Sequence, residues 1–164
     1  MLKIQKLSVD DGVENYNMLK NIEMNENEFT NPVKEMTFEE YKEWLILMDK
    51  WSKGEGLKEG YVSQTIYWLY NDDIPVGIGK IRHALTESSR KFGGNIGYAI
   101  SKEYRGKGFA TSFLKMLLQE MEKLNINEKI LTVEKNNYPS KRVIEKNGGK
   151  VVEENEDRWI LEID

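Results

Sequence analysis

The sequence contains no cysteine, and this absence excludes several classes of site together. Without thiols the chain forms no disulfide, binds no metal through thiolate ligands and has no cysteine nucleophile. Any covalent intermediate would need a different residue. Proline is also rare, with 3 residues, and His83 is the only histidine.

The sequence also has no long hydrophobic run and no strong excess of charge of one sign. No stretch approaches 18 uninterrupted apolar residues, and the first residues, MLKIQKLSVDDG, lack the apolar core of a signal peptide. The formal net charge of −4 and the pI near 5.3 leave no overall electrostatic footprint for nucleic acid. We therefore expect a cytoplasmic protein that binds neither a membrane nor nucleic acid.

The length and composition of the chain indicate one globular domain. The chain has 164 residues, of which 39% are hydrophobic and 32% charged. That is enough for one hydrophobic core and too little for two full ones. We expect a single domain over residues 1–164 and look for one site in it.

Hydrophobic periodicity and turn residues predict alternating strands and helices. Asn71 to Asp73 supply a hairpin turn, the residues Thr37 to Glu40 have the spacing of a capping box, and the polar stretch 25–36 reads as a loop. A strand, helix, strand unit within an otherwise antiparallel order indicates a mixed sheet with helices on its faces, which is an α/β (α+β mixed) fold. The predicted strands are 2–7, 65–70, 75–83, 94–100, 129–133, 150–153 and 158–163, and the predicted helices are 10–23, a second one opening at residue 37, 110–123 and 140–146.

One segment between a strand and a helix has the composition of an anion site. Gly106 and Gly108 remove side chains from the turn before the helix, so backbone N–H groups can close around a phosphate, and Arg105 and Lys107 add positive charge. A strand-to-helix turn with basic surface residues is the plain structural alternative. The segment does not match a P-loop, and Thr111 stands where a dinucleotide fingerprint needs its third glycine.

This segment resembles a known motif. Arg105-x-x-Gly108-x-Ala110 is similar to the acyl-CoA pyrophosphate motif of the GNAT superfamily of N-acetyltransferases, and Asn137-x-x-Ser140 with the residues 143–149 resembles the downstream part of that family. The runs around residues 68–69, 75–77, 81–85 and 93–100 further resemble a bacterial group of predicted acetyltransferases. The resemblance covers residues 64–150 well and the first helices only loosely.

The resemblance implies a GNAT-like fold, a mostly antiparallel, splayed mixed sheet flanked by helices. It also implies acetyl-CoA as cosubstrate, no metal, and direct attack of a primary amine of a small molecule or peptide on the thioester. The pantetheine arm would add to the strand 94–100, and the pyrophosphate would lie on backbone amides. The implied cofactor-binding residues are Tyr98, Ala99, Ile100, Arg105, Gly106, Lys107, Gly108, Phe109, Ala110, Thr111, Asn137 and Ser140.

The catalytic residues cannot be taken from the resemblance. Where family members often carry a Glu, this chain reads Gly93-Gly94-Asn95, and Ile144 replaces a Tyr. We predict His83 as the substitute base, because its pKa lies near neutrality and it ends a strand beside the predicted cleft. A structural histidine is the alternative. Tyr98 and Tyr138 are weaker candidates for protonating the departing thiolate, and packing is the alternative for both.

The sequence does not identify the acceptor amine. We predict that His83 and Glu134 bind the substrate. For Glu134 the alternative is that it lies at a solvated strand end. Tryptophans 44, 51 and 68 either line an acceptor pocket or pack in the core. The partners expected are acetyl-CoA and an amine acceptor, and a homodimer is left open. An acidic run either attracts a cationic amine or is a solvated face; it comprises Glu23, Glu26, Glu28, Glu35, Glu39, Glu40 and Glu43.

Two other functions compete with catalysis. Because the usual Glu and Tyr are missing, the same fold would also suit a non-catalytic acyl-CoA-binding sensor or regulatory module. A phosphate-binding protein of another class would show no preference for CoA over simple nucleotides.

Overall fold

The fold was analysed in a computed structural model that describes residues 1–26 and 28–164. The first part of the chain contains strand β1 (Leu2–Lys6), helix α1 (Val13–Lys20), the short strands β2 (Asn25–Glu26) and β3 (Phe29–Thr30), a 3-10 turn η1 (Pro32–Glu35) and helix α2 (Phe38–Ser52). The second part contains β4 (Gln64–Asn71), β5 (Ile74–Arg82), α3 (Glu87–Lys91), β6 (Ile96–Ile100), the 3-10 turn η2 (Lys102–Tyr104), α4 (Phe109–Lys123), β7 (Ile130–Glu134), α5 (Tyr138–Lys146), β8 (Gly149–Glu154) and β9 (Arg158–Ile163).

Most of these elements lie where the hydrophobic pattern predicts them. The capping box at the start of α2 is confirmed, because the Thr37 side chain accepts from the Glu40 amide while the Glu40 side chain accepts from the Thr37 amide. The loop predicted over 25–36 is different. Residue 27 lies outside the described residues, and the flanking ones form an antiparallel pair, β2 with β3, followed by η1. The pattern also missed α3.

Two antiparallel sheets meet at the strands β6 and β7. One sheet has the order β1-β4-β5-β6 and the other the order β7-β9-β8. At the junction the Asn95 amide donates to the Ile130 carbonyl (3.0 Å), and the Ile130 amide donates to Asn95 Oδ1 (2.9 Å). Beyond this clasp the two strands form no ladder. The expected mostly antiparallel, splayed sheet with flanking helices is therefore confirmed.

The glycine at position 94 makes the junction sterically feasible. Gly94 has φ +64°, and a Cβ added to it would lie 2.0 Å from the Ile130 carbonyl oxygen. No larger residue fits so close an approach of two backbones without moving one of them. The splay between β6 and β7 thus depends on this one position.

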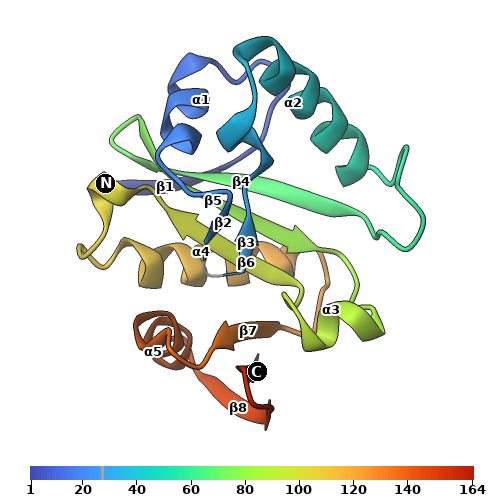
Figure 1. Cartoon of the computed structure of the whole chain (residues 1–164), viewed down its shortest axis with the longest axis vertical. Helices are drawn as coiled ribbons and strands as arrows, with labels where there is room; N and C mark the ends of the chain where they lie inside the picture. Colours follow the sequence, from blue (N-terminus) through green and yellow to red (C-terminus); the bar gives the residue numbers. More distant parts are fainter. Residues whose placement is uncertain (27) are drawn as a thin grey trace.

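Helices cover both faces of the four-stranded sheet (Figure 1). Helices α1 and α2 lie on one face and share a core with Ile66, Trp68 and Ile78 of β4 and β5. Helix α4 covers the other face and packs Phe113 and Leu117 against the second core cluster, which continues to α5 and the smaller sheet. The second core cluster therefore runs across the junction and joins the two sheets.

Candidate functional site

The turn from β6 into α4 has the geometry of an anion site. Gly106 has φ +75° and Gly108, the N-cap of α4, has φ +79°, and a Cβ added at either position would meet no atom within 4 Å. The first amide with a helical acceptor is that of Ser112, which donates to the Gly108 carbonyl at 3.4 Å. Within the described part of the chain, the amides of residues 106–108 donate to no protein group, and the next three begin a helix without a side-chain cap. An anion can approach these donors along an open face.

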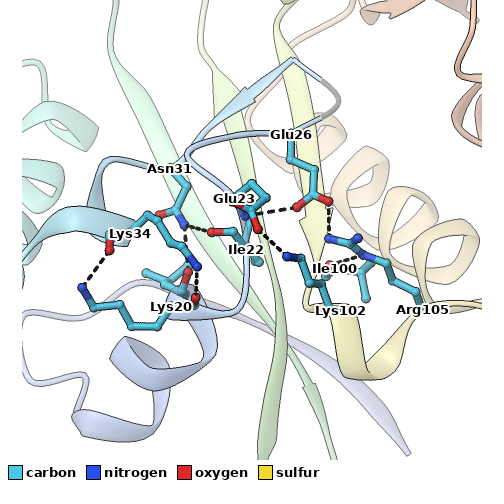
Figure 2. A network of polar contacts seen from close by, with 10 residues as sticks. Lys20, Ile22, Glu23, Glu26, Asn31, Lys34, Ile100, Lys102 and Arg105 are labelled. Carbon is cyan, nitrogen blue, oxygen red and sulfur yellow. Dashed lines mark hydrogen bonds and ion pairs between the residues drawn. The ribbon is translucent and has the colours of Figure 1, made fainter.

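The basic side chains of this turn differ in what they contact (Figure 2). Arg105 Nε donates to the Ile100 carbonyl at 3.0 Å, and its Nη2 pairs with Glu26. Lys102 pairs with Glu23. These contacts fasten the turn to the segment between α1 and β3. The guanidinium of Arg105, predicted to add charge for a pyrophosphate, is thus directed at protein groups, and among the described residues Lys107 is exposed and has no recorded ion pair.

The outer edge of β6 is open for backbone hydrogen bonding. The Ser101 amide donates to the Val76 carbonyl at 2.9 Å. Hydrogen bonding alternates along an antiparallel pair, so Ala99 also directs its backbone groups to β5, whereas Tyr98 and Ile100 direct theirs to the opposite edge. Of the three residues predicted to bind an extended arm, Tyr98 and Ile100 therefore direct backbone groups to the outer edge, and Ala99 does not. The Ile100 carbonyl already accepts from Arg105 Nε, so an arm would meet the Tyr98 groups and the Ile100 amide.

A small cavity, here called the gap cavity, lies between β6, β7 and α5. It measures about 30 Å³, and its lining includes Gly97, Tyr98, Thr132 and Ser140. The Tyr98 hydroxyl lies 3.4 Å from Ser140 Oγ, and burial raises the pKa of Tyr98 to about 12. Asn137 caps α5 by accepting from the Ser140 amide at 3.3 Å. The predicted pair Asn137 and Ser140 and the predicted Tyr98 therefore come together on opposite sides of the gap.

Glu28, named from the sequence only as one of the seven glutamates of the acidic run, closes one side of the gap cavity. Its side chain is 4% exposed, it accepts from Thr132 Oγ1, and it pairs with Arg158 Nε. Arg158 in turn stacks on the ring of Phe92 at 4.1 Å from its centroid. Glu28 is the only carboxylate among the described residues that line this cavity. No local signal distinguishes it from its acidic neighbours, because its partners lie on β7 and β9.

A second cavity, here called the large cavity, opens on the α2 face of β5 and measures about 650 Å³. Trp44 and Trp51 line it and are also buried members of the core cluster, so both alternatives hold for them. Trp68 is fully buried and donates from Nε1 to Asp11 Oδ2 at 2.7 Å. None of the seven glutamates of the acidic run lines it in the described part of the chain. Phe29 borders both cavities.

The remaining predicted residues lie away from both cavities. His83 Nε2 is 2.7 Å from Thr65 Oγ1, and burial, followed by repulsion from Lys6, lowers the pKa of His83. Tyr138 is 59% exposed and packs its ring against Trp159 at 5.6 Å. The side chain of Glu134 is 51% exposed. None of the three lines a described cavity, so their catalytic or substrate roles stay predictions without support from the geometry.

No group of three or more His, Asp or Glu side chains is placed to hold a metal ion in residues 1–26 and 28–164. Over the same part of the chain, no helix is both long and apolar enough to cross a bilayer.

Comparisons with known proteins were made for the whole chain. The family model described as acetyltransferase (GNAT) domain matches residues 2–150. No protein with a curated description matches the sequence.

Solved structures match the fold over nearly the full length. The ribosomal-protein-S5-alanine acetyltransferase from Vibrio fischeri is 16% identical, with a TM-score of 0.71 over 98% of this chain and 91% of that chain. The N-acetyltransferase PseH from Campylobacter jejuni, solved in complex with acetyl coenzyme A, is 12% identical, with a TM-score of 0.65 over 100% and 99%. The PaiA N-acetyltransferase from Thermoplasma acidophilum, solved in complex with coenzyme A, is 17% identical, with a TM-score of 0.63 over 100% and 99%. At these identities the likeness is one of fold.

Proposed function

Because the chain belongs to the acetyltransferase (GNAT) domain family, we propose that it transfers an acetyl group from acetyl-CoA to a primary amine of a small molecule or peptide. The amine attacks the thioester directly, without an acetylated enzyme. One observation carries the proposal: the amides of residues 106–111 are open to an anion at the end of a strand whose outer edge is also open. Two proteins of similar fold, one solved with acetyl coenzyme A and the other with coenzyme A, support the same assignment.

The residues of this chain fit the two polar parts of such a cosubstrate. The amides from Gly106 to Thr111 would hold the pyrophosphate, with Lys107 as the neighbouring free charge. The backbone groups of Tyr98 and Ile100 would hold the amides of the pantetheine arm, with Asn137 and Ser140 across the gap. Acetyl-CoA supplies the activated acyl group, and the chain supplies its position.

Proton transfers at the gap need two groups. An amine is a nucleophile only after it loses a proton, so a base must lie near the thioester end. We assign this role to Glu28, acting directly or through one water, because it is the carboxylate that lines the gap cavity. Tyr98 keeps its proton at neutral pH because its pKa is about 12, and its hydroxyl can donate to the departing thiolate.

Two measurements on the purified protein test the proposal. Calorimetry with CoA, with pantetheine and with ATP as a nucleotide control measures whether the site prefers the whole coenzyme. Release of free thiol from acetyl-CoA over a panel of amines measures transfer. Preferential CoA binding together with amine-dependent thiol release supports the proposal. Tight CoA binding without release from any amine would instead identify a binding module of the same fold, and equal binding of ATP would remove the CoA assignment.

A further inference from the structure

The large cavity has an unusual charge balance. Ile78, Lys80 and Arg82 alternate along β5 and all line it, so two cationic side chains project from one strand into the same space. Lys58 lies on the opposite wall, next to the rings of Trp51 and Tyr61. No Asp or Glu lines the cavity within the described residues.

The two strand cations, Lys80 and Arg82, have no acidic partner among the described residues. Over residues 1–26 and 28–164, no carboxylate lies within salt-bridge distance of Lys80 or Arg82. Lys80 Nζ lies 5.3 Å from the centroid of the Phe29 ring, and Arg82 Nη1 donates to the Gly94 carbonyl at 2.7 Å. Burial, together with repulsion between the two cations, lowers the pKa of Lys80 to about 8. A buried cation without a counter-charge is destabilising, and an anionic ligand would relieve that cost.

Other cations close to the large cavity and the gap cavity do have acidic partners. Lys102 pairs with Glu23, Arg105 with Glu26, and Arg158 with the nearly buried Glu28. The segment that supplies these carboxylates ends directly before Phe29, which borders the large cavity. The three cations Lys102, Arg105 and Arg158 are therefore neutralised by protein carboxylates. The cations inside the large cavity can be neutralised by a bound anion.

The cations also lie close to the place of acetyl transfer. Lys80 is the register partner of Gly97, which lines the gap cavity. Neighbouring strands are 4.7–4.9 Å apart, so a group bound at Lys80 lies about two strand spacings, roughly 10 Å or less, from the gap. The wall between the two positions is formed by Phe29, and the aromatic rings of Trp44, Trp51 and Phe92 provide an apolar surface for the body of a ligand.

We propose that the acetyl acceptor carries a second functional group, a carboxylate or phosphate within about 10 Å of its amine, and that Lys80 and Arg82 bind this anion. The inference rests on the proposed function and names its substrate class. It excludes polyamines and other purely cationic amines as preferred acceptors, because they would add positive charge to a cavity that already holds three cations. It also separates this cavity from the acidic run, which lies outside it.

Matched acceptors test the charge requirement. Initial rates of thiol release are compared for 4-(aminomethyl)benzoate and its neutral analogue 4-(aminomethyl)benzamide, with 4-(aminomethyl)phenyl phosphate as the arm that distinguishes carboxylate from phosphate. We expect kcat/KM for at least one anionic acceptor to exceed that of the benzamide by about ten- to hundredfold, the range of one charge-assisted hydrogen bond. A benzamide used equally well or better overturns the proposal.

Variants assign the effect to the cavity. Lys80→Met should remove most of the preference by raising KM for the anionic acceptor, while the benzamide rate changes little. Lys80→Arg should retain the preference, because arginine also binds an anion. If Lys80 acted as a catalytic amine, Lys80→Arg would instead lose activity. Lys115→Met, on the exposed side of α4, is the matched control. Equal losses for both acceptors in Lys80→Met would contradict anion binding.

A binding measurement separates this proposal from the proposed function. Calorimetry with 4-methylbenzoate, in the presence of CoA, needs no turnover. If no amine is acetylated although CoA binds, the proposed function fails, whereas 4-methylbenzoate binding that is lost in Lys80→Met still supports the anion site. Absence of 4-methylbenzoate and methyl phosphate binding to the wild-type protein would refute the anion site whatever the transfer assay shows.

Discussion

Gly108→Val is designed to separate cofactor binding from folding. A Cβ added at this position meets nothing within 4 Å, so the main cost to the fold is that of a left-handed residue at φ +79°. That cost is about 1–2 kcal/mol, which lowers Tm by roughly 2–8 °C in a domain of this size. The variant should therefore remain folded at 25 °C.

The same side chain occupies the space over the open amides where a pyrophosphate would lie. Loss of one or two hydrogen bonds to a charged oxygen weakens binding by about 1.5–3 kcal/mol each, so we expect CoA affinity to fall by at least roughly tenfold. Calorimetry with CoA measures the loss, and pantetheine, which has no diphosphate, should bind Gly108→Val and wild type alike.

The control for backbone strain is Gly148→Val. Gly148 has φ +90° and also has open space around the position of a Cβ, but it follows α5 instead of preceding α4. It should lose comparable stability and keep its CoA affinity. CoA affinity unchanged in folded Gly108→Val, or reduced equally in Gly148→Val, would show that the start of α4 does not hold the diphosphate.

Four further predictions concern other parts of the site. Gly94→Ala should lower the free energy of unfolding in urea by roughly 3 kcal/mol or more, because its Cβ would lie 2.0 Å from the Ile130 carbonyl oxygen; a loss below about 1 kcal/mol would mean that the junction yields easily. Glu28→Gln should lower kcat by about 10²–10⁴ with CoA affinity intact, as expected for loss of a general base, and an unchanged kcat would exclude it from proton transfer. Affinity for 4-methylbenzoate should fall as the pH rises through about 8, because Lys80 then loses its proton. In Lys80→Arg, where the guanidinium stays charged, the affinity should not change over this pH range; Arg82 and Lys58 are retained, and among the described residues of the cavity wall Tyr61 is the only other titratable one. His83→Gln tests the sequence-based assignment of the base: a reduced kcat with a shifted pH profile supports it, and an unchanged rate makes the histidine structural.

The sequence was most informative where structure depends on neighbouring residues. A capping box, a hairpin turn and a glycine-opened helix start are set by steric and hydrogen-bonding preferences within a few positions. Thr37, Gly106 and Gly108 accordingly have the conformations that their spacing predicts. The same local reasoning missed α3 and the short strands beside residue 27, because short elements carry little periodicity.

Residue roles within the site depended on contacts between distant segments. The sequence placed His83 beside the cleft from strand order alone, whereas in the fold its ring faces Thr65. Ala99 was grouped with its neighbours on β6, but hydrogen-bond alternation turns its backbone groups toward β5. Which side of a strand a group faces is a consequence of register, and register is set by the partner strand.

The sequence by itself determined the α/β fold class and the glycine-opened helix start between a strand and a helix, because both follow from local periodicity and glycine conformation. The GNAT type of that turn came from the resemblance of its motif, and its anion binding stays a proposal. Only the tertiary structure decided that Glu28 reaches Thr132, 104 positions away, and that Lys80 and Arg82 enter a cavity to which the described residues contribute no carboxylate. The physical reason is that electrostatic partners are chosen by distance in space. A charge pattern along the chain records how many cations there are, and folding determines which of them remain for a ligand.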